Sequence, residues 1–341
     1  MFDNFAAEKN ELISIAHGNG GLLSQKLIKQ TILPYFNNEL LEALPDSTYL
    51  AMPHSTIAIS TDSYVVSPLF FPGGDIGSLA VYGTANDLAM SGAKPLYLSC
   101  AFIIEEGFAI TTLEKILSTM KQALEVSGMS VITGDTKVVE HGKADGIYIN
   151  TTGIGVVQQN LSWGAKKIAA QDHILISGDL GCHGASIMSL RSGLKVDPQI
   201  KSDCAPLYPL IKELIDANIE VHCARDLTRG GLTVALIELV EDCGLQFELI
   251  ESSIAISEEV RSFCELLGLD ALTLACEGRC VLFVAEKDVD KAEAILKKIN
   301  CSASRIGKVN STTDARVVLR NPYGAHKTLR MPVLSNLPRI C

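Results

Sequence analysis

Four aspartates stand where carboxylates could hold a metal ion. Asp62 ends an apolar segment, and Asp87 follows Asn86 inside an apolar stretch, although Asp is a poor helix former. Asp135 follows another apolar segment, and Asp226 precedes a Thr-Arg-Gly-Gly run. Gathered carboxylates repel one another unless a cation lies between them, and such hard oxygen ligands suit Mg²⁺ bound together with substrate phosphates. Each aspartate could alternatively be a turn or cap residue, but each has Gly, Asn or Thr nearby, which favours a shared metal site.

The final residue, Cys341, adds a thiol at a chain end. Residues 331–341 contain Pro332 and Pro338, which lack an N–H, fix φ and bias the residue before them to extended geometry. Chain ends are also the part of a fold least held by packing. The sequence therefore predicts a mobile, semi-extended arm whose thiol can leave the body of the protein, be modified and return. The alternative is a frayed end, since free cysteine is usually a small buried hydrophobe.

Two segments before helical patterns could bind phosphate. The His-Gly-Asn-Gly-Gly run at 17–21 could offer backbone N–H groups near Gly20 and Gly21 at a helix N-terminus. It matches neither a Walker A loop nor a GxGxxG fingerprint, so a plain loop is an equal alternative. Thr228 and Arg229 also open a helical pattern and add a guanidinium for an anion.

Lys137 and Glu277 are further candidates for chemistry. Glu277 stands just before an apolar strand predicted over 280–285. A carboxylic acid at the mouth of such a strand could have a raised pKa and act as a base. The alternative is an ordinary carboxylate in a surface turn.

The elements that must position these residues follow from periodicity. Alternating apolar and polar residues from Thr56 predict a strand, and the pair Thr111 and Glu114 predicts a capping box that opens a helix. The first half is otherwise predicted to contain helices near 22–32 and 78–91 and strands near 96–104, 130–133 and 146–157.

The periodic pattern of apolar residues stops over 158–171, which we predict to be a linker. After it, strands and helices again follow one another. The second half is predicted to contain strands at 173–177 and near Val221, and helices over 184–191, 205–217 and 232–243. A chain of 341 residues is long for one core. We predict an α+β fold of two α/β domains, with a glycine-containing segment over 1–40, an N-terminal domain over 41–160, a C-terminal domain over 161–330 and the tail over 331–341.

Composition narrows the function classes. The formal charge of −10 disfavours nucleic acid and anionic membranes as partners, and means that an anion such as ATP needs local cations or metal. No apolar stretch approaches the roughly 18 residues of a membrane span, and residues 1–10 lack the order of a signal peptide. The ten cysteines are scattered without a Cys-x-x-Cys pair, which favours buried thiols over structural zinc. We expect a cytoplasmic protein.

The motifs taken together resemble the HypE family of hydrogenase maturation factors, also called carbamoyl dehydratases. The resemblance covers essentially the whole chain, and its terminal Pro-Arg-Ile-Cys is specific to that family. The aspartate motifs are shared with the wider superfamily of aminoimidazole ribonucleotide synthetase, thiamine monophosphate kinase and selenophosphate synthetase. The matching motifs, in order, are His-Gly-x-Gly-Gly at 17–21, Thr-Asp-Ser at 61–63, Phe-Pro-Gly-Gly-Asp-Ile-Gly at 71–77, Asn-Asp-Leu-Ala at 86–89, Gly-Asp-Thr-Lys at 134–137, Arg-Asp-x-Thr-Arg-Gly-Gly at 225–231 and Pro-Arg-Ile-Cys at 338–341.

The resemblance implies an ATP-dependent enzyme that acts on its own terminal cysteine. HypF would load Cys341 with a carbamoyl group, and the chain would dehydrate it to a thiocyanate that supplies cyanide to [NiFe]-hydrogenase through a HypC–HypD complex. It implies that Glu277 is the proton acceptor, with Lys137 in charge stabilisation or proton relay. It also implies a homodimer formed through the N-terminal domain. The residues implied to hold Mg²⁺ and the polyphosphate are Asp62, Asp87, Asp135 and Asp226 as metal ligands, and Gly20, Gly21, Asn86, Thr228 and Arg229 at the nucleotide.

The sequence departs from the family pattern at three positions, and two other functions are alternatives. In the family, a smaller residue is common at the position of Asn19, Pro at that of Leu227 and Lys at that of Ser78. The change at Ser78 could remove a phosphate contact. One rival is a selenophosphate synthetase-like or other superfamily kinase, although here the first cysteine is Cys100, far from the N-terminal glycine run. The other is a non-catalytic carrier in which Cys341 only shuttles a group, and the retained aspartates with Lys137 argue against it.

Overall fold

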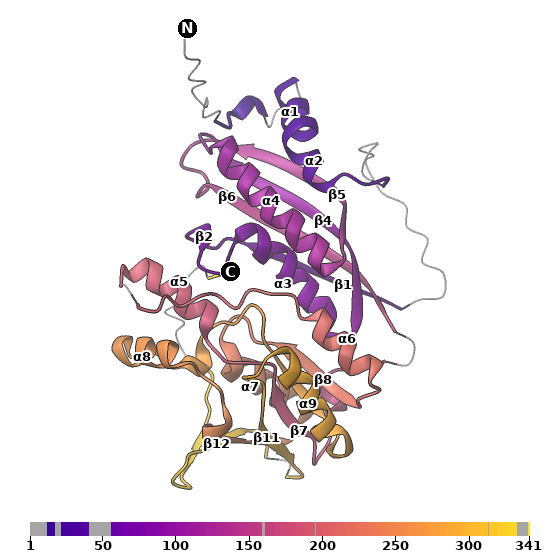
Figure 1. Cartoon of the computed structure of the whole chain (residues 1–341), viewed down its shortest axis with the longest axis vertical. Helices are drawn as coiled ribbons and strands as arrows, with labels where there is room; N and C mark the ends of the chain where they lie inside the picture. Colours follow the sequence, from indigo (N-terminus) through magenta and orange to yellow (C-terminus); the bar gives the residue numbers. More distant parts are fainter. Residues whose placement is uncertain are drawn as a thin grey trace.

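The fold consists of two α/β domains packed against one another (Figure 1). The computed structural model describes residues 12–17, 22–40, 56–158, 161–194, 196–312, 314–332 and 340–341. Over these ranges, no helix is both long and apolar enough to cross a bilayer. Both domains mix helices with a sheet, so the predicted α+β class is confirmed.

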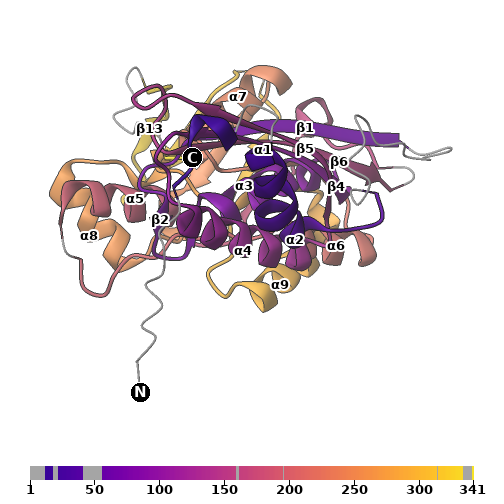
Figure 2. The same cartoon turned by 90° about the horizontal axis from the view of Figure 1, so that it is seen from above.

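The N-terminal domain is built on a sheet of four strands in the order β1-β6-β4-β5. Only the pair β4–β5 is parallel. The helices α3 and α4 cover one face of this sheet, and no helix of the described residues covers the other (Figure 2). The bounds are β1 Thr56–Tyr64, β4 Ala93–Glu105, β5 Ser130–Val139, β6 Ile147–Val157, α3 Ile76–Met90 and α4 Ile110–Ser127.

Shorter elements surround this layer. A helical run precedes β1, in the place where the spacing of apolar residues predicted a helix. A short hairpin leads into α3. Their bounds are η1 Ile15–His17, α1 Leu22–Lys26, the π-helical η2 Leu27–Ile32, α2 Leu33–Phe36, β2 Phe70–Phe71 and β3 Gly74–Asp75.

Burial explains why α3 lacks a polar face. Twelve of its fifteen residues are buried between the sheet, α4 and the C-terminal domain. By contrast, α4 is amphipathic, and its predicted apolar stripe, which includes Leu113, Leu117 and Leu124, is buried. Placing an Asp in a helix as enclosed as α3 costs free energy, so its presence there indicates a role.

The predicted capping box at Thr111 is wrong. The N-cap of α4 is Ala109, two residues before Thr111, and makes no side-chain cap hydrogen bond, so Thr111 lies inside the first turn. The box occurs instead at α3, where the Ser78 amide donates to Asp75 Oδ1 (2.9 Å) and the Asp75 amide donates to Ser78 Oγ (3.0 Å). Ser78 thus fixes the start of the helix that carries Asp87.

The C-terminal domain contains a seven-stranded sheet in the order β13-β12-β9-β11-β7-β10-β8. Only β12 and β9 pair in parallel. The strand bounds are β7 His173–Ile176, β8 Val221–Asp226, β9 Gln246–Ile250, β10 Cys280–Val284, β11 Ser304–Asn310, β12 Val317–Arg320 and β13 His326–Thr328. The helix bounds are α5 Cys182–Ser192, α6 Tyr208–Asp216, α7 Gly231–Cys243, α8 Glu258–Leu267 and α9 Val289–Ile299, with 3₁₀ turns η3 Ala165–Lys167, η4 Glu251–Ser253, η5 Ala271–Thr273 and η6 Glu286–Asp288.

Two boundaries that bear on the candidate site differ from the predictions. The helix expected from 205 begins at Tyr208, because the amide of Leu207 is held by Asn86 Oδ1 (2.7 Å) in the other domain. The strand expected over 130–133 continues to Val139, because it pairs in parallel with β4 along its whole length. Asp135 and Lys137 therefore lie within a strand and do not follow one.

Candidate active site between the two domains

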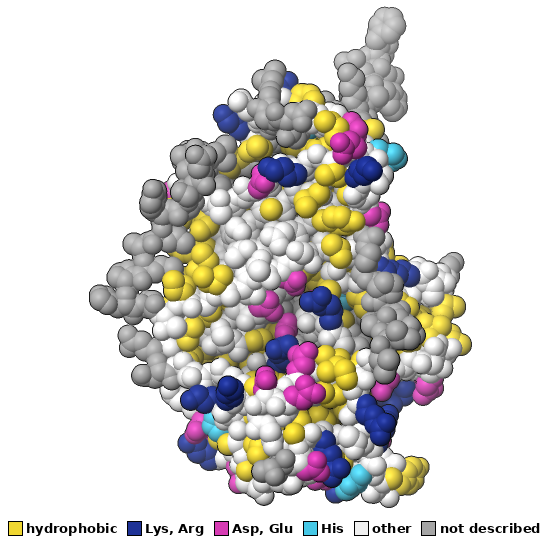
Figure 3. All heavy atoms as spheres, turned by 180° about the vertical axis from the view of Figure 1, so that it is seen from behind, with side chains coloured by type: hydrophobic (Ala, Val, Ile, Leu, Met, Phe, Trp, Pro, Cys, Tyr) yellow, Lys and Arg dark blue, Asp and Glu magenta, His cyan; other side chains and the backbone are white. Residues whose placement is uncertain are grey.

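A cleft of about 570 Å³ lies between the two domains. It is lined by side chains from β1 and α3 of the first domain and from the ends of β8 and the loop before β10 of the second. Figure 3 shows acidic and basic side chains gathered near the middle of the face that lacks the α3–α4 layer. Seven predicted site residues line this cleft, namely Asp62, Asp87, Asp226, Thr228, Arg229, Glu277 and Cys341.

Strand geometry brings Asp62 and Asp87 together. Ser60 and Asp62 alternate with more exposed neighbours along β1 and so share the face that α3 covers. Ser60 Oγ donates to Asp87 Oδ2 (2.6 Å) across that face. Burial raises the pKa of Asp87, the Ser60 hydrogen bond opposes this shift, and the charge of Asp62 reinforces it.

Asp226 adds a third carboxylate from the C-terminal domain. It is the last residue of β8, opposite Cys280 of β10. Burial raises its pKa to about 7, with a further contribution from the negative charge of Asp87. Thr228 and Arg229 then pass into α7 through two glycines with positive φ, and a Cβ on Gly231 would lie 2.5 Å from the carbonyl oxygen of Leu274. Glycine is therefore required where this anion-site candidate turns into its helix.

Glu277 is a buried acid held by its backbone. Its side chain is 3% exposed, and its Oε1 atom has no hydrogen-bond partner. The Glu277 amide donates to Asp203 Oδ1 (3.2 Å), and a Cβ on Gly278 would lie only 2.0 Å from the Asp203 carbonyl oxygen. Burial, followed by the charges of Asp226 and Asp203, raises the pKa of Glu277 well above its ordinary value. The surface-turn alternative for this residue is therefore wrong.

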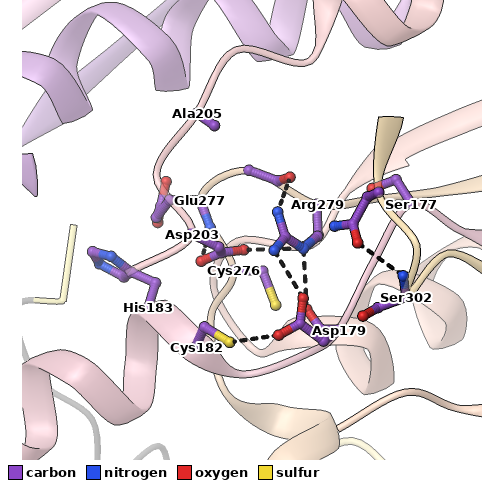
Figure 4. A network of polar contacts seen from close by, with 12 residues as sticks. Ser177, Asp179, Cys182, His183, Asp203, Ala205, Cys276, Glu277, Arg279 and Ser302 are labelled. Atoms are coloured by element: carbon purple, nitrogen blue, oxygen red, sulfur yellow. Dashed lines mark hydrogen bonds and ion pairs between the residues drawn. The ribbon is translucent and has the colours of Figure 1, made fainter. Parts of the chain in front are cut away.

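A second polar network supports the loop that carries Glu277. Arg279 Nη2 pairs with Asp179 Oδ1 (2.9 Å), and its Nε lies 3.9 Å from Asp203 Oδ2. Figure 4 shows Glu277, Asp203 and His183 to one side of this guanidinium. Arg279 thus offsets the charge of Asp203 while Asp203 holds the Glu277 backbone.

The last two residues of the sequence dock at the same cleft. The side chain of Ile340 is buried in the core of the N-terminal domain, and the Val65 amide donates to the backbone oxygen of Cys341 (3.2 Å). Burial, followed by the charge of Glu277, raises the pKa of the Cys341 thiol to about 12. Residues 333–339 of the predicted arm lie outside the described residues. In its docked position the thiol is a poor nucleophile, because only the thiolate attacks.

Asn86 joins the two domains. It is buried on α3, and its Nδ2 donates to the carbonyl oxygens of Ala205 (3.0 Å) and Glu277 (3.2 Å). Its Oδ1 accepts the amide of Leu207, so both side-chain N–H groups and the side-chain oxygen are hydrogen-bonded. The structure gives Asn86 a role in placing Glu277, while its predicted role at the nucleotide remains a prediction.

Asp135 and Lys137 are not brought into this cleft. They pair with one another (2.8 Å) and both are more than half exposed. Asp135 is in register with Ala101 of β4, and Ala101 is in register with Asn150 of β6. Asn150 is in turn in register with Ser63 of β1, the neighbour of Asp62. Asp135 therefore lies on the face opposite to Asp62, and three strand spacings, roughly 14 Å, separate their strands. Gly20 and Gly21 lie outside the described residues.

Sequence reasoning missed four residues that shape the cleft. Ser60 binds Asp87, Asp203 holds Glu277, His183 contacts the tail and Trp163 lines the cleft from the linker. Two of them carried a signal, because Ser60 lies two residues before Asp62 on a predicted strand and His183 directly precedes a predicted helix. Asp203 and Trp163 come from segments that showed no periodic pattern.

The charge balance of the cleft fits a divalent cation. Asp87, Asp226 and Glu277 have raised pKa values partly because each faces the other carboxylates. A cation would relieve this repulsion. Among the described residues, no three His, Cys, Asp or Glu side chains already form a metal-binding group. Mg²⁺ tolerates such a site, since it commonly keeps waters and takes phosphate oxygens as further ligands.

Comparison with known proteins places this arrangement in a family. Residues 46–157 match the N-terminal domain of AIR synthase related proteins, and residues 169–320 match their C-terminal domain. Carbamoyl dehydratase HypE of Escherichia coli (strain K12) is 44% identical over 336 residues, which cover 96% of this chain and 99% of that protein. The chain belongs to the HypE family.

Solved HypE structures match the fold as well. A crystal structure of hydrogenase maturation protein HypE in complex with ATP is 40% identical, with a TM-score of 0.92 over 96% of this chain and 99% of that one. A HypE chain from a HypE–HypF complex is 41% identical, with a TM-score of 0.79 over 90% of this chain and 99% of that one. The HypE fold predicted from the motifs, with two AIR synthase-type domains, is thus confirmed.

Proposed function

We propose that this chain is a carbamoyl dehydratase that uses ATP to convert an S-carbamoyl group on Cys341 into an S-thiocyanate, as a step in [NiFe]-hydrogenase maturation. The observation that carries the proposal is the docking of Cys341 in the cleft that also holds Glu277 and the carboxylates. The name carbamoyl dehydratase HypE of the Escherichia coli relative and the ATP complex of a 40% identical HypE support it.

The reaction divides into two steps that balance. The carbamoyl oxygen attacks the γ-phosphorus of ATP, the bond from that phosphorus to ADP breaks, and one N–H proton is lost. The C–O bond then breaks, phosphate leaves with the former carbamoyl oxygen, and loss of the second N–H proton forms the nitrile. The products are the thiocyanate, ADP, phosphate and one proton, with no oxidant or reductant required.

Different residues of the cleft bind phosphate, accept protons and hold the metal ion in this proposal. Thr228 and Arg229 lie at the start of α7, where a helix N-terminus and a guanidinium favour phosphate. Glu277 is the proposed acceptor of an N–H proton, because a raised pKa makes its carboxylate form a stronger base. Asp62, Asp87 and Asp226 would hold Mg²⁺, which when bound neutralises charge on the transferring phosphoryl group.

The high pKa of the docked thiol indicates that Cys341 is loaded elsewhere. We propose HypF as the protein that carbamoylates it, which the HypE–HypF complex of a 41% identical chain supports. A HypC–HypD complex is the proposed acceptor of the cyanide group. Once loaded, Cys341 carries the substrate and is not the nucleophile of the dehydration.

We also propose a homodimer formed through the N-terminal domain. The face of the sheet opposite to α3 and α4 exposes Ile57, Ile59 and Ile103. Burial of such side chains against a second copy is favourable. Asp135 and Lys137 lie on this same face, so a dimer formed there would bring them against the second copy. Their roles as metal ligand and charge-stabilising group remain predictions.

The deciding experiment is intact and peptide mass spectrometry after incubation with HypF, carbamoyl phosphate and ATP. We expect a carbamoyl increment on Cys341 followed by loss of water in the wild type. In Asp87→Asn we expect the carbamoyl increment without water loss, because the side-chain volume is kept while a charge of the metal site is removed. HypF consumes ATP too, so this comparison isolates the site of the chain itself.

Three results would oppose the proposal. An unmodified Cys341, with HypF shown to be active on another HypE, would favour a superfamily kinase. Water loss in Asp87→Asn at the wild-type rate would show that the assignment of the metal site is wrong. Carbamoylation without any ATP-dependent water loss in the wild type would favour the carrier function.

A further inference from the structure

A histidine lies where the tail enters the body of the protein. His183 is fully buried on α5, and its Nε2 lies 2.7 Å from the carbonyl oxygen of Ile340. Its Nδ1 lies 2.8 Å from Ser202 Oγ. The residues it joins are 157 positions apart in the sequence, so this contact exists only when the tail is docked.

The partners determine which nitrogen carries the proton. A carbonyl oxygen only accepts, so Nε2–H donates to Ile340. Burial lowers the pKa of His183, which favours the neutral ring, so Nδ1 accepts from the Ser202 hydroxyl. Ser202 Oγ in turn accepts the amide of Cys204 (3.1 Å). This ordered chain of donors points one N–H at the tail.

The ring itself is held independently of the tail. Phe71 packs against it in an edge-to-face arrangement with centroids 5.3 Å apart. The Ser202 amide is bonded to the carbonyl oxygen of Pro72 (2.7 Å), which fixes the loop that orients Nδ1. The donor is therefore oriented by groups outside the tail that it binds.

We propose that His183 is a positioning residue that docks the Ile340–Cys341 end of the chain and so places the Cys341 sulfur in the cleft with Glu277. The apolar side chain of Ile340 supplies burial, while His183 fixes the position of the backbone. Ser202 is followed by Asp203, which holds Glu277, so one loop sets both the docked tail and the proton acceptor. The inference rests on the proposed function only in treating the docked sulfur as the reacting group.

The test measures docking directly. The full chain is treated with iodoacetamide, without nucleotide or HypF, and alkylation of each cysteine is followed by peptide mass spectrometry. In the wild type, Cys341 is expected to react more slowly than exposed Cys301. His183→Phe keeps an aromatic ring against Phe71 but removes the donor, so we expect Cys341 to react about two- to tenfold faster, which is the effect of losing one hydrogen bond.

Two internal references and a rescue variant separate docking from folding. Cys100 is buried in the core of the first domain and must remain protected if the variant is folded. His183→Gln retains an N–H near the position of Nε2 and should restore most of the protection of Cys341. Dehydration of carbamoylated Cys341 should slow in His183→Phe and recover in His183→Gln.

The outcomes distinguish this inference from the proposed function. Unchanged reactivity of Cys341 in a folded His183→Phe overturns the inference, even if the wild type forms thiocyanate. Faster alkylation in that variant supports docking by His183, even if no thiocyanate forms in any variant. If His183→Phe also exposes Cys100, Ser202→Ala becomes the test, since it removes the group that orients the ring. Wild-type reactivity of Cys341 in that variant would then overturn the inference.

Discussion

At the scale of single residues, burial gives Glu277 and Cys341 different roles in one cleft. Burial raises the pKa of both groups, which makes the carboxylate a better proton acceptor and the thiol a worse nucleophile. Both shifts suit an elimination in which protons leave nitrogen while sulfur stays bonded to carbon. The two groups influence one another as well, since the charge of Glu277 contributes to the raised pKa of the thiol.

The choice between Glu277 and Lys137 as proton acceptor belongs to this scale. We expect Glu277→Gln to lower the rate of water loss from carbamoylated Cys341 by about 10²- to 10⁴-fold, the range for loss of a general base. The amide keeps the shape of the acid but cannot take up a proton, so ATP binding should be unchanged. Single-turnover mass spectrometry gives the rate, and calorimetry gives the affinity for ATP.

Lys137→Met is the matched comparison for this prediction. Lys137 is exposed and paired with Asp135, away from the cleft in a single chain, so its loss should lower the rate by a smaller factor. A larger loss in Lys137→Met than in Glu277→Gln would reverse the assignment of the two roles.

At the scale of elements, loops and strand ends carry the site while α3 and the sheets hold it in place. The contacts that join the two domains differ in kind from those that hold the C-terminal sheet. Asn86 joins α3 to the loops before α6 and β10 through uncharged hydrogen bonds. His222 joins β8 to the start of β7 through charged ones, because its Nδ1 lies 2.8 Å from Asp172 Oδ2 and its Nε2 lies 3.1 Å from Glu220 Oε1.

The contacts of His222 predict a dependence of stability on pH. Burial alone would lower the pKa of His222, but its hydrogen bonds to Asp172 and Glu220 outweigh burial and raise the pKa. The folded protein therefore binds this proton more tightly than the unfolded chain does. The resulting stabilisation is complete below the ordinary histidine pKa of about 6.5 and is lost as the pH rises through the raised value.

We therefore expect His222→Asn to lower the free energy of unfolding by about 1 kcal/mol more at about pH 5.5 than at about pH 9. Chemical denaturation at the two pH values measures the difference. The same change at exposed His326 is the control and should show little dependence on pH. An equal cost of His222→Asn at both pH values would contradict a charged role for this histidine.

At the scale of the whole molecule, the candidate active cleft exists because two domains and the chain end meet. The N-terminal sheet and α3 contribute Asp62 and Asp87, the C-terminal domain contributes Asp226 and Glu277, and Cys341 enters between them (Figure 1). A tethered substrate turns capture into an intramolecular event, which raises its effective concentration at the site. The tail can thus be a carried substrate without being a structural part of the nucleotide site.

Cys341→Ala tests that separation. We expect this variant to bind Mg²⁺ and ATP like the wild type, because Cys341 packs only at the edge of the core and the phosphate-binding candidates are unchanged. The increase in unfolding temperature on adding Mg²⁺ and ATP, compared between wild type, Cys341→Ala and the exposed-site control Cys301→Ala, measures this. Thiocyanate formation should be absent in Cys341→Ala alone. Loss of the nucleotide-dependent increase in Cys341→Ala would instead mean that the tail is a structural element of the site.

The sequence by itself determined the element types and much of the candidate site. Periodicity predicted β1, α3 and the strand after Glu277, and local motifs singled out Asp62, Asp87 and Asp226 before any contact was known. These signals are local, since side chains repeat every two residues in strands and every 3.6 in helices, and a polar residue in an apolar run stands out. The family resemblance then supplied the chemistry that composition could not.

Only the tertiary structure decided which of these residues act together. Asp135 carries the same kind of motif as Asp87, yet the register of β5 places it on the opposite face of the sheet within one chain. The roles of Asp203, His183 and Trp163 were not predicted, because they arise from contacts between segments far apart in the sequence. The raised pKa values of Glu277 and Cys341 likewise depend on burial and on neighbouring charges that only the packing of two domains brings together.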